Sequence, residues 1–471
     1  MEESIVLKCI LTPLLALAAL GAHASDPAHT GHGAPSTVSA PAATATPSAS
    51  SAAVSPQAVA SAPAVQGGVM PTRMPMGKAR PQLGSGVAFA PDGRLWLVGV
   101  NAQGGLFVQR AVLGGAPGAP QALVQWEAPR VLDNQGDPIS ADSENRPKLA
   151  FGPAGQVVIS YTQPLPKPNT GFIRMLRSLD GGQTFSAPQT VHTDRQEITH
   201  RFESIAFDAK GALHTVWIDK RDLERAPRVG KKSSYRGAAI YRNVSLDGGA
   251  TFGPDLRVAD HSCECCRIAL AVGADGRAHA LWRHVFAPNV RDHAFATLDA
   301  SPASTSPEAT ASAAPSAVPV RATFDDWRVD GCPHHGPALV AAAQGGFHAV
   351  WFGMRKQGAL DAEGVPGVRY ARLNADGTPQ PGSEQLLPDP RAEHADVLAA
   401  GQQVAVVWRS VDGARSSARA WLSNDGGRSF REQLLGEVSG PNDFPRLAHH
   451  AGRMVVVWRN AQEVLAYALS F

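Results

Sequence analysis

Four cysteines and two histidines lie in two short segments of this chain, and their types favour metal or thiol chemistry. The first segment, from His261 to Arg267, reads HSCECCR, and the second, from Asp330 to Gly336, reads DGCPHHG. Thiolate sulfur combined with imidazole nitrogen suits copper or zinc far better than magnesium or calcium. The candidate ligands are Cys263, Cys265, Cys266, Cys332, His334 and His335.

The spacing of the cysteines is unusual for a disulfide framework. Three of them lie within residues 263–266, too close together to staple three distant segments. In an extended segment, Cys263 and Cys265 would point to one side and Cys266 to the other. A metal site is therefore the leading interpretation. Two alternatives stay open: structural disulfides, for example between Cys263 and Cys332, and a thiol redox centre.

Copper is the first choice of ion and zinc the second. Met70, Met74 and Met76 lie in a Pro-containing stretch before the repeats described below. Their thioether sulfur is a soft ligand that suits Cu(I), which favours copper. A hydrophobic packing role would explain these methionines equally well.

The elements that must position these residues form a repeat. Each unit is a short apolar strand, a Gly-containing turn and a second apolar strand that often ends in Trp; the units begin near residues 86, 148, 204, 268, 338, 396 and 446. Further strand-like segments follow each unit. The sequence therefore predicts an all-β propeller of four-stranded antiparallel blades, with seven repeats counted and six blades as the alternative. The last unit has room for only three strands, so a strand within residues 66–83 is expected to complete its blade.

A motif of the form S-x-D-x-G-x-[TS]-F occurs three times, at Ser178–Phe185, Ser245–Phe252 and Ser423–Phe430. It resembles the Asp-box, or bacterial neuraminidase repeat, of sialidases and related β-propellers, and with the strand pattern the resemblance covers most of residues 84–471. In that family the Asp-box is a structural turn between outer strands, away from the active site. The resemblance thus implies the fold, and it does not by itself imply sialidase activity.

The innermost strands of a propeller run in the same direction, so the residues just before each one should gather at one mouth of the channel. Aligning neighbouring units on Trp282 and Trp351 places Cys263 and Cys332 at equivalent positions. The same alignment matches Cys265 with His334 and Cys266 with His335. The two segments are therefore expected to face each other across this mouth.

Polar residues from the other units should collect at the same mouth and could orient the ligands. These residues are Glu144, Asn145, Arg146, His200, Arg201, Glu203, Arg267, Glu393, His394, Asp396, Asn442, Asp443 and Arg446.

The resemblance also implies an alternative function, a sialidase-type glycoside hydrolase or glycan-binding propeller. Sialidases clamp the substrate carboxylate with three arginines, and here Arg146, followed by Pro147, is similar to part of the family's Arg-Ile-Pro element, while Tyr370 is a candidate nucleophile.

The N-terminal region reads as an export signal and a tether. An apolar run over residues 9–22 ends at Ala22-His23-Ala24, which predicts a signal peptide over residues 1–24 and a periplasmic protein. Residues 25–66 are rich in Ala, Ser and Pro and are expected to be disordered. Residues 67–471 are expected to form one propeller domain, with a loop insertion of similar composition at 299–320.

Charge and hydropathy narrow the partners. The formal net charge of +2 comes without basic runs, which argues against nucleic acid, and no later apolar stretch is long enough to cross a bilayer. We expect a monomer that binds, buffers or transfers a metal ion and exchanges it with a copper donor or acceptor protein. Catalysis, by an exo-sialidase-like hydrolase or a metal redox enzyme, stays open, as does a protein-interaction scaffold with structural disulfides.

Overall fold

The computed structural model describes residues 82–114, 124–142, 144–229, 232–233, 235–300, 318–355 and 364–471. All described residues belong to one compact unit, Gly68–Phe471. The predicted signal peptide, the tether, the three methionines near residue 70 and most of the insertion at 299–320 lie outside the described residues.

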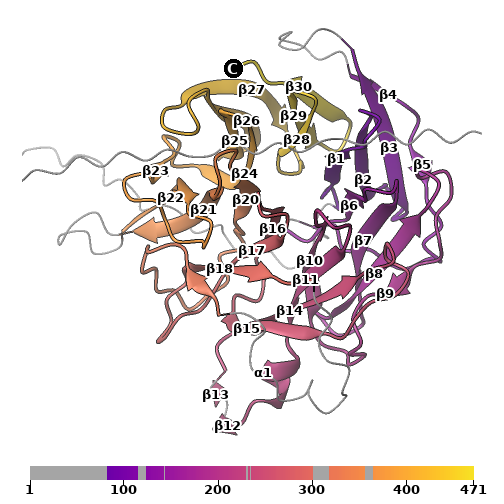
Figure 1. Ribbon diagram of the computed structural model, residues 1–471, viewed down its shortest axis with the longest axis vertical. Helices are drawn as coiled ribbons and strands as arrows, with labels where there is room; N and C mark the ends of the chain where they lie inside the picture. Colours follow the sequence, from indigo (N-terminus) through magenta and orange to yellow (C-terminus); the bar gives the residue numbers. More distant parts are fainter. Residues whose placement is uncertain are drawn as a thin grey trace, which may run out of the picture. The chain divides into compact units, whose positions relative to one another are not determined.

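Seven antiparallel sheets are arranged around a central axis, which confirms the predicted β-propeller and excludes six blades (Figure 1). Blade 1 contains β1 (Gly86–Phe89), β2 (Leu95–Val100), β3 (Leu106–Leu113), β4 (Val124–Trp126) and β5 (Arg130–Val131). Blade 2 contains β6 (Lys148–Phe151), β7 (Val157–Pro164), β8 (Gly171–Ser178) and β9 (Gln189–Thr190). Blade 3 contains β10 (His200–Phe207), β11 (Leu213–Asp219), β14 (Ala238–Ser245) and β15 (Leu256–Ser262).

The remaining blades follow the same order from the axis outward. Blade 4 contains β16 (Ala269–Val272), β17 (Ala278–Arg283), β18 (His293–Leu298) and β19 (Val320–Arg321). Blade 5 contains β20 (Ala338–Ala341), β21 (Phe347–Arg355), β22 (Val365–Leu373) and β23 (Gln385–Leu386). Blade 6 contains β24 (Ala392–Ala400), β25 (Gln403–Asp412), β26 (Arg415–Ser423) and β27 (Arg431–Ser439), and blade 7 contains β28 (Arg446–His450), β29 (Arg453–Arg459) and β30 (Val464–Ala468).

The second strand of each blade forms the core, because both of its faces are covered by neighbouring blades. Every residue of β2, β11 and β17 is buried, and the continuous apolar sequence of β2 fits such a two-sided environment. Trp217, Trp282, Trp408 and Trp458 are among the largest fully buried side chains. The Trp that ends the predicted repeat is therefore a packing residue.

The ring closes between blades 1 and 7. Leu95 and Leu97 of β2 share a hydrophobic cluster with Val455 and Val457 of β29. The strand expected within residues 66–83 falls almost wholly outside the described residues, and residues 82–85 form no strand. In the described part of the chain, blade 7 has three strands.

The three Asp-box motifs lie where the resemblance places them, between the third and fourth strands of blades 2, 3 and 6. In the first copy, Ser178 Oγ accepts a hydrogen bond of 2.8 Å from Gly182 N, and Asp180 accepts one of 2.9 Å from Thr184 N. Gly182 has a φ of +80°, a conformation that glycine adopts without strain. Phe185 packs against the core. The motif therefore holds a turn on the outside of the blade.

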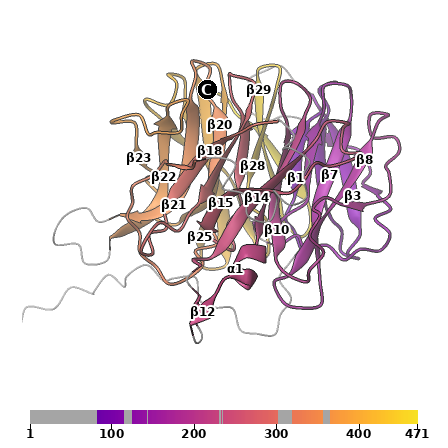
Figure 2. The ribbon, with the colours of Figure 1, turned by 60° about the horizontal axis from the view of Figure 1, so that its bottom comes forward.

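One short helix and a hairpin interrupt blade 3. Helix α1 (Arg221–Arg225) and strands β12 (Arg228–Val229) and β13 (Lys232–Ser233) follow β11 and project from one face of the propeller (Figure 2). Asp219, at the end of β11, pairs with His200, at the start of β10, so this is the face where the innermost strands begin. Among the described residues, no helix has the length and apolar character needed to cross a membrane.

Candidate metal centre

The two cysteine segments occupy equivalent places in neighbouring blades. Residues 263–268 connect β15 of blade 3 to β16 of blade 4, and residues 322–337 connect β19 of blade 4 to β20 of blade 5. Ala269 pairs with Leu281 in blade 4, and Ala338 pairs with Val350 in blade 5, which confirms the alignment of the two repeats on their Trp residues. Each segment therefore leads directly into the innermost strand of a blade.

Four thiols converge between these two segments. The Sγ atom of Cys263 lies 3.8 Å from that of Cys265 and 3.4 Å from that of Cys266. The sulfur atoms of Cys263, Cys265 and Cys332 all lie within 4.8 Å of one another, and all four cysteines are free thiols. We call Cys263, Cys265, Cys266 and Cys332 the thiol cluster.

The local conformation of the first segment differs from the extended one expected from the sequence. Residues 264–266 form a bend, and the Cys263 N–H donates to Arg283 O at 2.9 Å. The expectation that Cys266 would point away from Cys263 is wrong, because the bend turns its sulfur back toward the others. Three adjacent cysteines can therefore share one centre.

The thiol cluster has an apolar interior and one exposed member. Cys263, Cys265 and Cys266 are buried in a hydrophobic cluster with Trp282 and Ile268, whereas Cys332 is exposed. An apolar shell limits the access of water to buried sulfur. The exposed thiol belongs to the other blade, so one ligand position faces solvent.

The thiols are coupled through hydrogen bonds and a nearby positive charge. Bonds from the neighbouring thiols hold the pKa of Cys263 well below its usual range, and the charge of Arg283 acts in the same direction. Burial raises the pKa of Cys266, and the hydrogen bond with Cys263 raises the pKa of Cys332 to about 12. Arg291 Nη1 lies 3.8 Å from Cys263 Sγ. The cluster thus favours one central thiolate surrounded by thiols, and a soft cation could replace their protons.

The two candidate histidines do not lie with the thiols. His334 is exposed, has a φ of +58°, and belongs to neither group of potential ligands in the described residues. His335 is buried and is grouped instead with Glu393 and His394, whose ligand atoms lie within 4.8 Å of one another. The structure therefore places the four cysteines together, puts His335 in a second group, and leaves His334 outside both.

The expected gathering of polar residues at one mouth is present, and we call this set of residues the rim. Arg267 of blade 4 donates to Glu144 of blade 2 at 2.7 Å, and Glu144 Oε1 also bonds His394 Nδ1 of blade 6. Arg146 pairs with Asp443 at 3.0 Å, across blades 2 and 7. Burial by itself raises the pKa of Glu144. The positive charges of Arg267, His394 and Arg146 outweigh this effect and hold the pKa well below its usual range.

Tyr370 is not part of the rim. Its side chain is fully buried in blade 5, and its hydroxyl lies 2.7 Å from Nδ1 of His348. Burial raises its pKa well above that of an ordinary phenol. The suggestion that Tyr370 acts as a nucleophile is therefore wrong, because no substrate can reach it.

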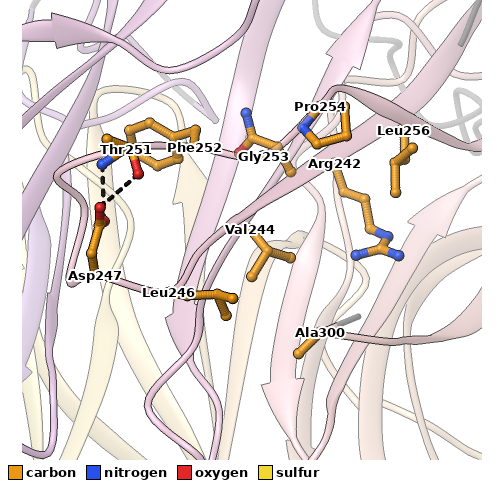
Figure 3. A pocket seen from close by; sticks show the side chains of 11 residues that line it. Arg242, Val244, Leu246, Asp247, Thr251, Phe252, Gly253, Pro254, Leu256 and Ala300 are labelled. Atoms are coloured by element: carbon orange, nitrogen blue, oxygen red, sulfur yellow. Dashed lines mark hydrogen bonds between the residues drawn. The ribbon is translucent and has the colours of Figure 1, made fainter. Parts of the chain in front are cut away.

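A separate cavity of about 300 Å³ lies beside the second Asp-box (Figure 3). Arg242, Leu246, Asp247 and Phe252 contribute to its lining, and Asp247 is bonded to Thr251 within the turn. None of the six candidate ligands lines it.

Fold and rim together define a seven-bladed propeller with a cluster of four thiols where blades 4 and 5 begin. Solved structures with a similar fold include a polysaccharide lyase of the ulvan lyase type, at 11% identity over 83% of this chain and 94% of that chain, with a TM-score of 0.46. A Penicillium chrysogenum α-L-arabinanase matches at 14% identity over 77% and 96%, with a TM-score of 0.44.

A Hadza microbial sialidase also matches, at 13% identity over 75% of this chain and 74% of that chain, with a TM-score of 0.42. No protein-family model matches the sequence, and no curated protein matches it. At these identities and TM-scores the similarity is one of fold alone. The chemistry of this chain must be argued from its own residues.

Proposed function

We propose that this chain is an exported copper-binding propeller that holds Cu(I) in the thiol cluster and buffers or transfers the ion in the periplasm. The observation that carries the proposal is the convergence of four free thiols from two blades. Thiolate is a soft ligand that selects Cu(I), with zinc as the alternative ion. An apolar shell around three of the sulfurs favours a compact ion of low charge.

The exposure of Cys332 supports transfer rather than permanent storage. Three thiols are buried, and the fourth is presented to solvent by the neighbouring blade. A thiol of a donor or acceptor protein could replace Cys332 at the ion while the buried thiols keep hold of it. The partner implied is therefore a periplasmic copper carrier, and the propeller is expected to act as a monomer.

The test is a titration of the reduced protein with Cu(I) under anaerobic conditions, against a chelator of known affinity. We expect tight stoichiometric binding in the wild type and a marked loss of affinity in Cys332→Ser. Because Cys332 is exposed, this change should leave the unfolding temperature unaltered. Absence of free thiols in the isolated protein, with no copper uptake after reduction, would instead establish structural disulfides.

A second candidate function is sialidase-type glycan hydrolysis or binding, and one feature of the rim favours it. Burial lowers the pKa of Arg146, and the charges of Arg446 and Arg267 lower it further, so three guanidinium groups lie near one another. A substrate carboxylate at these groups would compete with Asp443 and Glu144, which already pair with Arg146 and Arg267. Turnover of a fluorogenic sialoside that disappears in Arg446→Ala would favour this candidate, and no turnover would remove its hydrolytic form.

A further inference from the structure

A stack of four rings crosses the rim at the starts of blades 5, 6 and 7. His335 stacks on Phe352, with ring centroids 4.4 Å apart, and on His394, at 4.3 Å. His394 in turn stacks on Phe444 at 3.5 Å. The two imidazoles are thus held at the centre of the stack by aromatic rings on both sides. Ring stacking therefore holds both imidazoles in place, and it leaves Nδ1 of His335 without a hydrogen-bond partner among the described residues.

Those nitrogen atoms have an unusual set of partners. His335 is 8% exposed, and its buried Nδ1 makes no hydrogen bond within the described part of the chain. A buried polar atom without a partner is costly unless a ligand satisfies it. The ligand atoms of His335, His394 and Glu393 lie within 4.8 Å of one another.

Glu144 orients His394 as a carboxylate orients a metal-binding histidine. Its carboxylate bonds Nδ1 of His394 and also accepts from Arg267 and from Gly336 N. A proton held on Nδ1 by this carboxylate leaves Nε2 with a free lone pair, which is the tautomer that binds metal ions.

Glu393 supplies an oxygen ligand beside the two imidazoles. Arg409 binds Oε1 of Glu393 through Nε at 2.6 Å and through Nη2 at 2.5 Å. This pairing fixes the carboxylate and leaves Oε2 for a ligand. Two imidazoles and one carboxylate form a donor set typical of a zinc-like divalent ion with one open position.

We propose that His335, His394 and Glu393 form a second metal site, for a zinc-like divalent ion, that is separate from the thiol cluster. Their ligand atoms lie within 4.8 Å of one another, so modest side-chain shifts suffice to form bonds of ~2.0–2.1 Å to one ion. The fourth position is open to water or to a small anionic ligand. The site differs from the thiol cluster in donor type and therefore in ion preference.

Cobalt(II) distinguishes the two sites because thiolate ligands give an intense near-ultraviolet charge-transfer band, whereas nitrogen and oxygen ligands give only weak visible bands. In the reduced full-length mature protein we expect both signals. His335→Phe keeps the ring stack but removes the ligand nitrogen. It should therefore lower the Co(II) affinity of the site with nitrogen and oxygen ligands at least about tenfold. The charge-transfer band should be unchanged.

His450→Phe is the matched control, because His450 also stacks on a phenylalanine, Phe89, but lies outside both clusters. It should leave both signals unchanged. The inference would be overturned if the wild type bound Co(II) only through thiolate ligands. Unchanged Co(II) affinity in both His335→Phe and His394→Phe would also overturn it. A missing charge-transfer band with the visible bands retained would count against the proposed function and leave this inference standing.

Discussion

The two ends of the segment Cys332–His335 lie in different chemical surroundings. Cys332 joins three thiols packed among apolar side chains, while His335 joins another imidazole and two carboxylates within a network of arginines. Between them, His334 takes a positive φ, which few residues other than glycine adopt. A single backbone turn therefore gives one short segment access to two donor sets.

Arg283 lies between the two environments. It donates to the main-chain oxygen of His335 at 3.0 Å, and its charge lowers the pKa of Cys263. The comparison teaches that proximity in sequence does not make residues ligands of one ion. Two clusters with different donor atoms should respond independently to substitution.

The largest expected effect comes from removing two buried thiols. Cys265→Ser combined with Cys266→Ser leaves too few soft donors, so Cu(I) affinity should fall by roughly two orders of magnitude or more; in structural zinc sites, ~10–16 kcal/mol of binding free energy is shared among the ligands. Zinc binding at the imidazoles, measured by calorimetry, should change little. Equal losses at both sites would mean that the clusters are one centre.

The orienting carboxylate gives the next effect. Glu144→Gln should weaken zinc binding by about 10–100-fold, because outer partners of metal ligands contribute on that scale. Glu203→Gln is the matched control, since Glu203 is also a buried rim carboxylate but bonds Ser160 and Thr162 instead. If both variants bind zinc as the wild type does, the carboxylate does not orient a ligand.

His348 is a buried histidine outside both clusters, so it shows what burial alone does to the pH dependence of stability. Burial lowers the pKa of His348 to about 4, below its usual value of 6.5. Above pH 6.5 the group is neutral in both states and contributes nothing; as pH falls toward 4, the unfolded chain binds the proton more readily and stability drops. Between pH 6.5 and 4, the free energy of unfolding of His348→Gln, measured in urea, should therefore fall by roughly 1–3 kcal/mol less than that of the wild type. If the free energy of unfolding fell equally with pH in the two proteins, burial would not lower the pKa of His348.

The smallest effect is expected on the outer side of the blades. Ser178→Ala removes the hydroxyl that accepts from Gly182 N in the first Asp-box. The free energy of unfolding should fall by about 1 kcal/mol, with no change in copper or zinc affinity. Altered metal affinity in this variant would show that the outer turns and the rim are coupled.

Much of the fold could be predicted from the sequence, because its signals are local. Strand–turn–strand repeats ending in Trp predicted a propeller with seven repeats counted, and the resemblance of three motifs to the Asp-box implied where outer turns occur. The equivalence of Cys263 and Cys332 also followed from the repeat, since equal positions in neighbouring blades lie side by side. These features depend on residues close together in the chain.

Other features depended on the closed ring. Contacts among Glu144, Arg267 and His394 join blades 2, 4 and 6, and no local pattern marks such pairs. The burial of Tyr370 likewise follows from packing against the next blade.

The sequence by itself determined the propeller fold and the residues capable of metal or thiol chemistry, because hydrophobic periodicity and turn motifs act over short range. The tertiary structure alone decided how those residues are grouped. A bend brought Cys266 back to Cys263, and a positive φ at His334 separated His335 from the thiols. Ring closure then carried His394 and Glu144 to His335, because only a closed propeller brings distant blades together at one mouth.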